Sequence, residues 1–554
     1  MDNFIEHIIK AIKKEVKTDI VLETPPSPEM GDYAFPCFSL AKIYKKNPNE
    51  IAQNLSEKIK KSKFIKEIKV QGPYLNFFVN KNMLSEETIV KILKEKDKYG
   101  SSDEGKGKKL ILEHTSINPN ASPHVGRARN ALIGDSLVKV LRFQNYKVEV
   151  HYIVNDIGKQ IAMLVLGVRG KKKLDFHSLL GAYQKASKGL ENNKKKEEEV
   201  FKLLKDLEGG DKAIRKEFKK VVDIALKGQT KILGELGIKY DSFDPESEYL
   251  WSKKTNKVLD LLKKTGKFYF DKDNRVILDQ KGFGLGMKMP VLVLTRGDGT
   301  SLYPLRDIAY ALDLFSKADN YIIVLGEDHK LYNEQVNTAL LMLGKKPRKA
   351  LYYSFVLLDE GKMSTRKGNL VLLEDFMEEA VKKAQKELKK RYKKVDIKAA
   401  KTIAYGALKY SILKVSPEKN VTFNWHQALS FEGETAPYIQ YAYARICSII
   451  KKHKKSIPKK ADFSLLDEKE ETQLVKKLAL FPEVVEKAAK ELRPNGITNY
   501  AYEVAKLFNE FYHMHNILKE EKNIKQARLL LAISVKQVLN NSLKLLGIDV
   551  LEKM

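Results

Sequence analysis

Cysteine is scarce in this chain of 554 residues, which contains only Cys37 and Cys447, far apart in the sequence. Two distant cysteines do not form a disulfide framework, and they are too few for a cysteine-based zinc site. We assign no metal-ligating residue in the chain. The same scarcity is typical of a protein in a reducing compartment.

Long apolar runs are also missing. No apolar stretch approaches the roughly 20 residues that a bilayer-spanning helix needs. The first residues, 1–6, include early acids and lead into a lysine-rich helix, which is unlike a secretory signal. We expect a soluble, cytoplasmic protein with no membrane association.

Acidic residues are outnumbered by basic ones. Lys and Arg total 101 against 71 for Asp and Glu, which gives a formal net charge of +30. Such an excess favours a polyanionic partner, because contacts to phosphates supply much of the affinity for nucleic acid. A generally lysine-rich proteome would give the same composition, so charge alone leaves both interpretations open.

Two short motifs together indicate a nucleotide-handling site. The first is Pro123-His124-Val125-Gly126-Arg127. It follows a strand-like segment at 110–112 and opens a helix predicted over 128–144, whose first backbone amides would face an anion. The second is Lys362-Met363-Ser364-Thr365-Arg366-Lys367-Gly368-Asn369, which follows a strand-like segment at 355–358. A loop with these cations and hydroxyls can close on a triphosphate.

Hydrophobic patterning divides the chain into three parts. Residues 1–100 are predicted to form an α+β domain, with an amphipathic N-terminal helix and short strands at 69–70 and 74–79. In residues 101–375 strands and helices alternate, which predicts a Rossmann-like, doubly wound parallel sheet. Ligands bind such sheets at the carboxyl ends of the strands. Residues 376–554 are predicted to be all-helical.

The pattern of the middle part is interrupted. A helical, charge-rich insertion is predicted at about 170–241, and its lysine and glutamate run at 194–199 is expected to be a solvated helix face. Strands return at 276–278, 291–294 and 321–325. In the last part, helices are predicted at 376–392 and 482–492, the second starting with a proline.

The two motifs resemble the signatures of class I aminoacyl-tRNA synthetases, and their surroundings resemble the arginyl-tRNA synthetase family. The matching segments, in the family's order, are Glu113-His114-Thr115-Ser116-Ile117-Asn118-Pro119-Asn120, His124-Val125-Gly126, Asn130-Ala131-Leu132-Ile133-Gly134-Asp135, Asn155-Asp156-Ile157-Gly158-Lys159-Gln160, Thr295-Arg296-Gly297-Asp298-Gly299-Thr300 and Tyr303-Pro304-Leu305-Arg306-Asp307. Further similar segments lie near both ends, so the resemblance covers nearly the whole chain.

The resemblance implies an arginine–tRNA ligase that acts in protein synthesis. Such an enzyme activates L-arginine with ATP and Mg²⁺ to arginyl-adenylate and transfers it to tRNA(Arg), releasing AMP and pyrophosphate. The same resemblance implies that residues 1–100 bind the outer corner of the tRNA and that residues 376–554 bind the anticodon. The family is most often monomeric, so a monomer is expected.

The resemblance also assigns ATP-site roles. His124 is expected to donate to developing phosphate charge, with Val125, Gly126 and Arg127 beside the nucleotide. From the second motif, the resemblance implies ATP contacts by Lys362, Met363 and Ser364. Two residues depart from the family's pattern.

The first departure is Arg127, which stands where the signature has its second histidine. A guanidinium is permanently charged but still donates hydrogen bonds, so we expect retained activity with altered ATP binding. The second departure is Thr365, which stands where a second lysine is usual. Whether Lys362, Arg366 or Lys367 supplies the catalytic charge is left open.

Selection of arginine needs a planar acceptor, and a carboxylate is the strongest partner for a guanidinium. The resemblance places Tyr303 and Asp307 on the guanidinium; they are one helical turn apart and can share a face. It places Glu113 and Asn118 at the α-amino group, with His329 near the same pocket. Without the resemblance, Asp307 could be a helix-start residue paired with Arg306.

Two other functions are considered. A tRNA-binding relative without catalytic activity would be consistent with Arg127 and Thr365, although His124, Lys362 and Asp307 are all present. A synthetase for cysteine or methionine would want a thiol-binding zinc or an apolar pocket. The few cysteines and Asp307 are evidence against that alternative.

Overall fold

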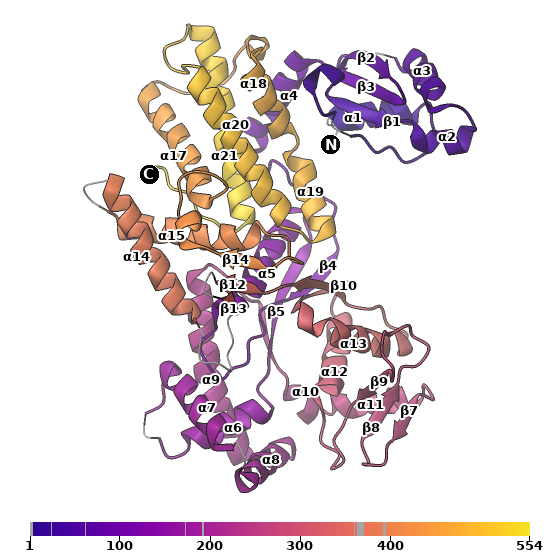
Figure 1. Ribbon diagram of the computed structural model, residues 1–554, viewed down its shortest axis with the longest axis vertical. Coiled ribbons are helices and arrows are strands. Elements are labelled where there is room, and N and C mark those ends of the chain that lie inside the picture. Colours follow the sequence, from indigo (N-terminus) through magenta and orange to yellow (C-terminus); the bar gives the residue numbers. More distant parts are fainter. Residues whose placement is uncertain are drawn as a thin grey trace.

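The computed structural model describes residues 4–23, 25–60, 62–171, 173–190, 193–358, 361–362, 371–391 and 395–554. Figure 1 shows an elongated molecule with a tall helical bundle at one end and a sheet near its middle. A small N-terminal unit lies beside the bundle, and two further units lie beyond the sheet. None of the helices in the described ranges is long and apolar enough to cross a membrane.

The central sheet has five strands in the order β11-β10-β4-β5-β6, and every neighbouring pair is parallel. The strands are β4 (Lys109–Glu113), β5 (Lys147–Val154), β6 (Ser242–Pro245), β10 (Asn320–Gly326) and β11 (Lys349–Tyr353). This arrangement confirms the predicted parallel sheet. The strand order reverses between β4 and β10, and ligands of such sheets bind at the carboxyl ends beside the reversal.

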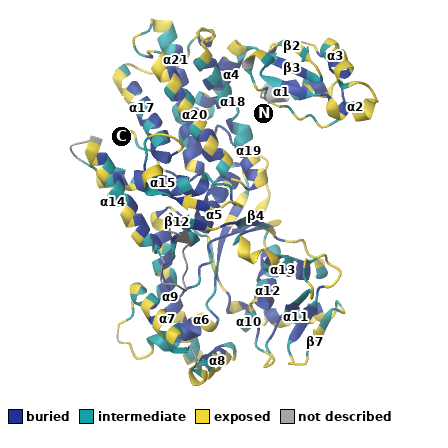
Figure 2. Ribbon diagram, in the orientation of Figure 1, coloured by how far each residue is buried: buried dark blue, intermediate teal, exposed yellow. Residues whose placement is uncertain are grey.

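A long helix, α5 (Val125–Phe143), connects β4 to β5. Its apolar residues are buried on nearly every side. The helix packs against β4, β5, β10 and β12 (Val356–Leu358) and against the C-terminal helices α15 (Ile397–Leu413), α19 (Phe481–Glu491) and α21 (Lys522–Leu545). One core joins sheet and bundle through this helix, as the buried residues in Figure 2 show. The helix thus joins the sheet to the bundle.

The insertion predicted at about 170–241 is helical. It consists of α7 (Phe176–Leu190), α8 (Lys194–Glu208) and α9 (Lys212–Glu235), with a core of their own that they share with α6 (Lys159–Val168). The described lysine and glutamate run at 194–199 is mostly exposed, as expected for a solvated face.

The strands that return after the insertion belong to two different sheets. β8 (Val276–Asp279) pairs antiparallel with β7 (Phe268–Phe270) and with β9 (Val291–Val293), forming a separate small sheet. Their short connections cannot hold the crossover that parallel pairing requires. Of the three predicted strands, β10 alone joins the parallel sheet.

The N-terminal unit contains α1 (Phe4–Lys13), α2 (Phe38–Tyr44), α3 (Pro48–Lys58) and an antiparallel sheet in the order β1-β3-β2. Its strands are β1 (Tyr33–Pro36), β2 (Ile65–Gln71) and β3 (Tyr74–Val79). The next helix, α4 (Lys81–Glu95), packs against the C-terminal α18 and α21. After it, the Tyr99 hydroxyl donates to the carbonyl of Leu478 at 2.9 Å, so the N-terminal unit is attached to the bundle.

The C-terminal part is mainly helical, as predicted. It contains α14 (Leu373–Arg391), α15 (Ile397–Leu413), α17 (Ala436–His453), α18 (Lys469–Ala479), α19 (Phe481–Glu491), α20 (Asn495–Met514) and α21 (Lys522–Leu545). Pro482 lies in the first turn of α19. A short strand, β14 (Val421–Phe423), interrupts the helices and pairs in parallel with β12 (Val356–Leu358).

Candidate active site

His124 is the N-cap residue of α5, in extended backbone conformation. Burial first, and then the nearby charge of Arg127, lowers the pKa of His124 to about 4. The imidazole is therefore neutral at pH 7 and can donate one N–H to an oxygen. A Cβ on Gly126 would lie 3.0 Å from ring atoms of His124, so the glycine leaves room for the ring.

The chain on both sides of the second signature is anchored at the site. Lys362 belongs to β13 (Gly361–Lys362), which pairs antiparallel with β12. After the signature, Leu372 forms a bridge with His124, and the amide of Val125 donates to the carbonyl of Val371 at 3.2 Å. The chain that follows the second signature therefore lies beside the first signature. The predicted site residues Met363, Ser364, Arg366 and Lys367 lie outside the described residues.

Arg129 was not predicted, although it ties α5 to the chain that leads into the second signature. Its guanidinium is fully buried and donates to the carbonyls of Ser354 at 2.6 Å and Ser416 at 3.0 Å. Burial lowers its pKa to about 10. The one available signal was a cation among the apolar residues of a predicted core helix.

The turn after β4 has an unusual backbone. Thr115 and Ser116 have φ values of 78° and 42°, in the left-handed region that a β-branched residue rarely adopts. The amide of Thr115 donates to Asn130 Oδ1 at 2.5 Å, and Tyr240 donates to the Thr115 hydroxyl at 2.8 Å. Such strain persists where the surroundings fix it, as at many active sites.

The helical insertion reaches this turn through Gln229 of α9. Its fully buried amide donates to the carbonyls of Asn118 at 3.0 Å and Ala121 at 2.9 Å. Its oxygen accepts from the Tyr152 hydroxyl at 3.1 Å. The side-chain amide of Asn118 donates to Gln160 Oε1 at 3.0 Å. The insertion therefore supports the chain that leads to His124.

Glu113 ends β4 and is buried at the carboxyl end of the sheet. Its carboxylate accepts a hydrogen bond from Tyr321 of β10 and another from Ser116 at 3.3 Å. Burial raises the pKa of Glu113 to about 7, and the charge of Asp307 adds to this effect. The charges of the two predicted substrate-binding acids, Glu113 and Asp307, therefore interact.

Tyr303 and Asp307 lie in the first turns of α12 (Tyr303–Phe315). The Tyr332 hydroxyl donates to Asp307 Oδ2 at 2.7 Å, and the rings of Tyr303 and Tyr332 have centroids 4.9 Å apart. His329 is half-exposed, with its ring 6.5 Å from that of Tyr332. The structure therefore brings these three predicted residues together around Tyr332, which was not predicted.

The alternative pairing of Asp307 with Arg306 is wrong. Arg306 points to the buried Glu246, with 2.8 Å between Nε and Oε1. Asp307 instead forms a fork with Arg348, whose Nη1 and Nη2 lie 2.6 and 2.9 Å from its two oxygens. Adjacent residues of a helix point in different directions, which separates the two partners.

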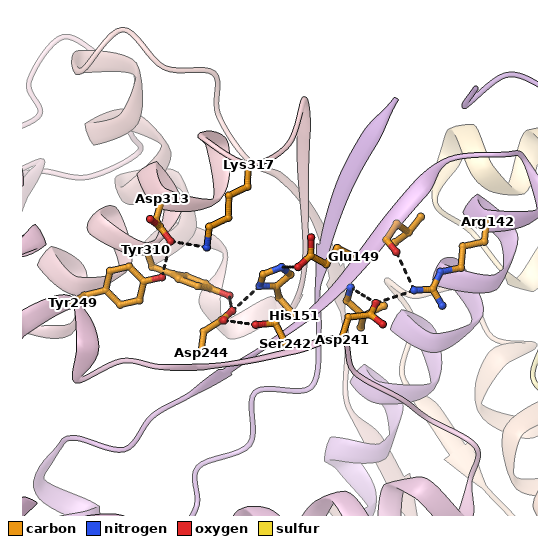
Figure 3. Close-up of polar contacts among 12 residues, drawn as sticks. Arg142, Glu149, His151, Asp241, Ser242, Asp244, Tyr249, Tyr310, Asp313 and Lys317 are labelled. Carbon is orange, nitrogen blue, oxygen red and sulfur yellow. Dashed lines mark hydrogen bonds and ion pairs between the residues drawn. The ribbon is translucent and has the colours of Figure 1, made fainter. Parts of the chain in front are cut away.

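A polar cluster fixes α12 against the edge of the sheet (Figure 3). Asp244 of β6 accepts from Tyr310 of α12 at 2.8 Å, and His151 Nδ1 of β5 lies 2.6 Å from the same carboxylate oxygen. Further along α12, Asp313 pairs with Lys254 at 2.6 Å. These contacts hold the helix that carries Tyr303 and Asp307.

No group of three His, Cys, Asp or Glu that could hold a metal ion is found in the described part of the chain.

The chain matches three family descriptions in sequence. They are "Arginyl tRNA synthetase N terminal domain" over residues 2–79, "tRNA synthetases class I (R), catalytic domain" over 88–425 and "DALR anticodon binding domain" over 439–554. The catalytic match covers more than half of the chain. The chain belongs to the arginyl-tRNA synthetase family.

Relatives of this family support the assignment over the full length. A protein from Methanocaldococcus jannaschii named arginine–tRNA ligase is 41% identical, over 99% of this chain and 98% of its own. One of the same name from Methanococcus aeolicus is 40% identical over 100% of both chains. The resemblance seen in the motifs is thereby confirmed.

Solved structures of the family have the same fold. The arginyl-tRNA synthetase of Thermus thermophilus superposes with a TM-score of 0.85 at 26% identity, over 99% of both chains. That of Plasmodium falciparum gives 0.84 at 22% identity, over 99% of this chain and 98% of its own, and shows the shared fold.

Proposed function

We propose that this chain is an arginine–tRNA ligase, which activates L-arginine with ATP to arginyl-adenylate and transfers the arginyl group to tRNA(Arg). The products are arginyl-tRNA, AMP and pyrophosphate. The observation that carries the proposal is the pair of acids Glu113, at the carboxyl end of β4, and Asp307, in the first turns of α12, whose charges interact. This pair lies in a chain that aligns over nearly the whole length of relatives named arginine–tRNA ligase.

The reaction needs positioned donors and cations, because both of its steps redistribute negative charge on oxygen. His124, neutral at pH 7, donates an N–H to phosphate oxygen at the start of α5. Gly126 presents its amide at the start of that helix, where a phosphate is favoured, beside Val125, whose amide bonds to Val371. Arg127 supplies a permanent charge in place of the second histidine. From the second signature, the lysine at 362, with Met363, Ser364, Arg366 and Lys367, completes the proposed ATP site.

The chain binds the arginine substrate at both ends, its guanidinium and its α-ammonium group. Tyr303 and Asp307 face its guanidinium, which a carboxylate binds strongly. Glu113 accepts from the α-ammonium, and Asn118 lies beside the same end. His329 borders the pocket, 6.5 Å from the Tyr332 ring.

Mg²⁺ is part of the proposal as the companion of ATP. This hard cation prefers oxygen ligands and is commonly held by phosphates and water together with few protein groups. When bound, it neutralises charge on the triphosphate. The residues of the chain position the nucleotide through the donors named above.

The tRNA is proposed to contact the two outer parts. Residues 1–100 would hold its outer corner and residues 376–554 its anticodon, on either side of a catalytic part at 101–375 with its insertion at about 170–241. The net charge of +30 favours this partner. We propose a monomer acting in the cytoplasm, where tRNA is charged for translation.

The test is attachment of each labelled amino acid, and of citrulline, to total tRNA by the purified protein with ATP and Mg²⁺. We expect arginine alone to be attached. Citrulline has the shape of arginine without its charge, and rejection by roughly 10⁴-fold is typical of sites built on hydrogen bonds. Binding of tRNA without attachment of any amino acid would instead favour the non-catalytic relative and would direct attention to Arg127 and Thr365.

A further inference from the structure

The carboxylate proposed to bind the substrate guanidinium already holds a guanidinium of the chain itself. Arg348 donates to both oxygens of Asp307, from Nη1 to Oδ1 at 2.6 Å and from Nη2 to Oδ2 at 2.9 Å. Tyr332 donates to Oδ2 as a third partner, at 2.7 Å. This is the geometry that arginine forms with carboxylates when the two planes align.

Arg348 is held firmly from the side of the protein. Its side chain is 1% exposed, and its Nε donates to Asn333 Oδ1 at 2.6 Å. Asn333 is itself buried and bonds to the Tyr352 hydroxyl at 2.8 Å. The backbone amide and carbonyl of Arg348 both bond to the side chain of Asn337. Three elements, α12, α13 (Lys330–Met342) and β11, thus meet at Arg348, which they shield almost completely from solvent.

The Asp307 carboxylate has one hydrogen-bond acceptor position left for a substrate. An ionised carboxylate offers about four lone-pair positions. Arg348 uses two and Tyr332 uses one, which leaves one position, on Oδ1. The Asp307 side chain is 17% exposed and Tyr303 is 55% exposed, so a substrate approaches from the side of Tyr303. The guanidinium of the substrate can therefore form one hydrogen bond with Asp307, but it cannot form the two parallel bonds of a bidentate pair.

The charges of Glu113, Asp307 and Arg348 support the same conclusion. The charges of Glu113 and Asp307 interact with each other, and Arg348 interacts electrostatically with both. With Arg348 in place, the three groups carry a net charge of −1 when ionised, which matches the net charge of +1 of L-arginine. Without it, the acids would repel one another and Asp307 would lose the partner that fixes its plane.

We propose that Arg348 is a specificity-determining positioning residue, which orients Asp307 and leaves it one acceptor position for the substrate guanidinium. This inference rests on the proposed arginine-charging function. It assigns Arg348 no contact with the substrate; the residue acts through Asp307. Arginine binding should therefore depend on Arg348, whereas ATP binding should not.

The experiment compares arginine charging by the unmodified protein, Arg348→Ala and Arg348→Lys, with and without added guanidinium chloride at low millimolar concentration. Arg275→Ala serves as the control, because Arg275 also pairs with an aspartate, Asp271, through two of its nitrogens, but lies in the turn between β7 and β8 of the small antiparallel sheet. In Arg348→Ala we expect the KM for arginine to rise roughly tenfold or more, with the KM for ATP unchanged. Added guanidinium should occupy the vacated space and restore part of the activity, whereas it should inhibit the unmodified protein by competing with arginine.

Arg348→Lys keeps the charge but not the fork, and it should show a smaller rise in the KM for arginine that guanidinium does not correct. If Arg348→Ala does not fold, this rise in Arg348→Lys is the deciding result. An unchanged KM for arginine in a folded variant would overturn the inference. So would an equal loss for arginine and ATP that guanidinium leaves uncorrected, because that pattern reflects a merely structural role. Failure of the unmodified protein to charge arginine would instead refute the proposed function itself.

Discussion

The hydroxyl of Tyr321 on β10 donates a hydrogen bond to the buried carboxylate of Glu113 on the neighbouring strand β4. Glu113 is paired with Ile323, two residues from Tyr321, so both side chains lie on one face of the sheet. Two effects therefore oppose each other at Glu113. Burial raises its pKa, and the bond from Tyr321 favours the ionised form, with a resulting pKa of about 7.

The first prediction concerns pH. The proposed role of Glu113 toward the α-ammonium requires the ionised form, so kcat/KM for arginine should fall as pH drops below about 7. Tyr321→Phe removes a bond that lowers this pKa and should move the fall to higher pH. Glu113→Gln should give a low value with no such limb. Rates measured from pH 5.5 to 8.5 test this, and an identical limb in Glu113→Gln would contradict it.

The same shift has an opposite consequence for stability. Because the pKa of Glu113 is higher in the folded than in the unfolded chain, folding is favoured below the unfolded value and this contribution is lost as pH rises toward 7. In Glu113→Gln the dependence of the free energy of unfolding on pH between about 4.5 and 7 should be weaker. Urea unfolding at several pH values measures it, and an unchanged dependence would argue against a buried, protonated Glu113.

The second prediction concerns the packing of α5 on the end of β4. A Cβ at Gly134 would lie 2.3 Å from the ring of the buried His114. Gly134→Ala should therefore destabilise the fold by about 1–3 kcal/mol through overpacking. Gly181→Ala is the matched control, because Gly181 lies in α7 with no heavy atom near the added Cβ. The Gly181→Ala change should stabilise the fold by about 0.4–1 kcal/mol. Thermal unfolding of both variants tests this, and a Gly134→Ala variant as stable as Gly181→Ala would contradict the prediction.

The third prediction concerns Arg129. Replacement by Met keeps an apolar stem but leaves the carbonyls of Ser354 and Ser416 without their donor. Unsatisfied buried groups cost about 1–3 kcal/mol each, so unfolding should shift to clearly lower denaturant. Because these carbonyls flank β12 and β14, the KM for ATP should also rise. Arg142→Met, at the half-exposed end of α5, is the comparison and should change the KM for ATP little.

The fourth prediction concerns the insertion. Gln229→Leu removes the donor to the carbonyls of Asn118 and Ala121, and the turn before His124 should lose its fixed conformation. We expect kcat/KM to fall for both arginine and ATP, since both proposed sites depend on this turn. Gln53→Leu, at an exposed position of α3, should leave both values unchanged. Wild-type kinetics in Gln229→Leu would show that the insertion does not support the site.

Much of the fold could be predicted from the sequence because its periodicities are local. The apolar run of β4, the helix after His124 and the charged helices of the insertion each follow from neighbouring residues. The pairing of β8 and β9 in a separate sheet could not be predicted, because strand propensity does not specify a partner. β14 was missed for a related reason: three residues are too few to show a period.

At the site, the motifs indicated residues that the structure places at the end of β4 and at the starts of α5 and α12, namely Glu113, His124 and Asp307. The residues that hold them were not found, since their partners are distant in sequence: Gln229 lies 111 residues from Asn118, Tyr321 lies 208 from Glu113, and Arg348 lies 41 from Asp307. A buried arginine at 129 among apolar residues was the one local sign of such a role. Long-range polar contacts leave no periodic trace in a sequence.

The measurement that tests the account most directly is arginine charging of tRNA by Asp307→Asn beside the unmodified protein. The amide has the shape of the carboxylate but not its charge, so the guanidinium loses its ionic partner. We predict that the unmodified protein charges arginine and that the variant, folded as judged by circular dichroism, loses roughly 100-fold or more in kcat/KM for arginine with an unchanged KM for ATP. Charging by the variant at the rate of the unmodified protein would contradict the assignment of Asp307 as the acid that selects arginine.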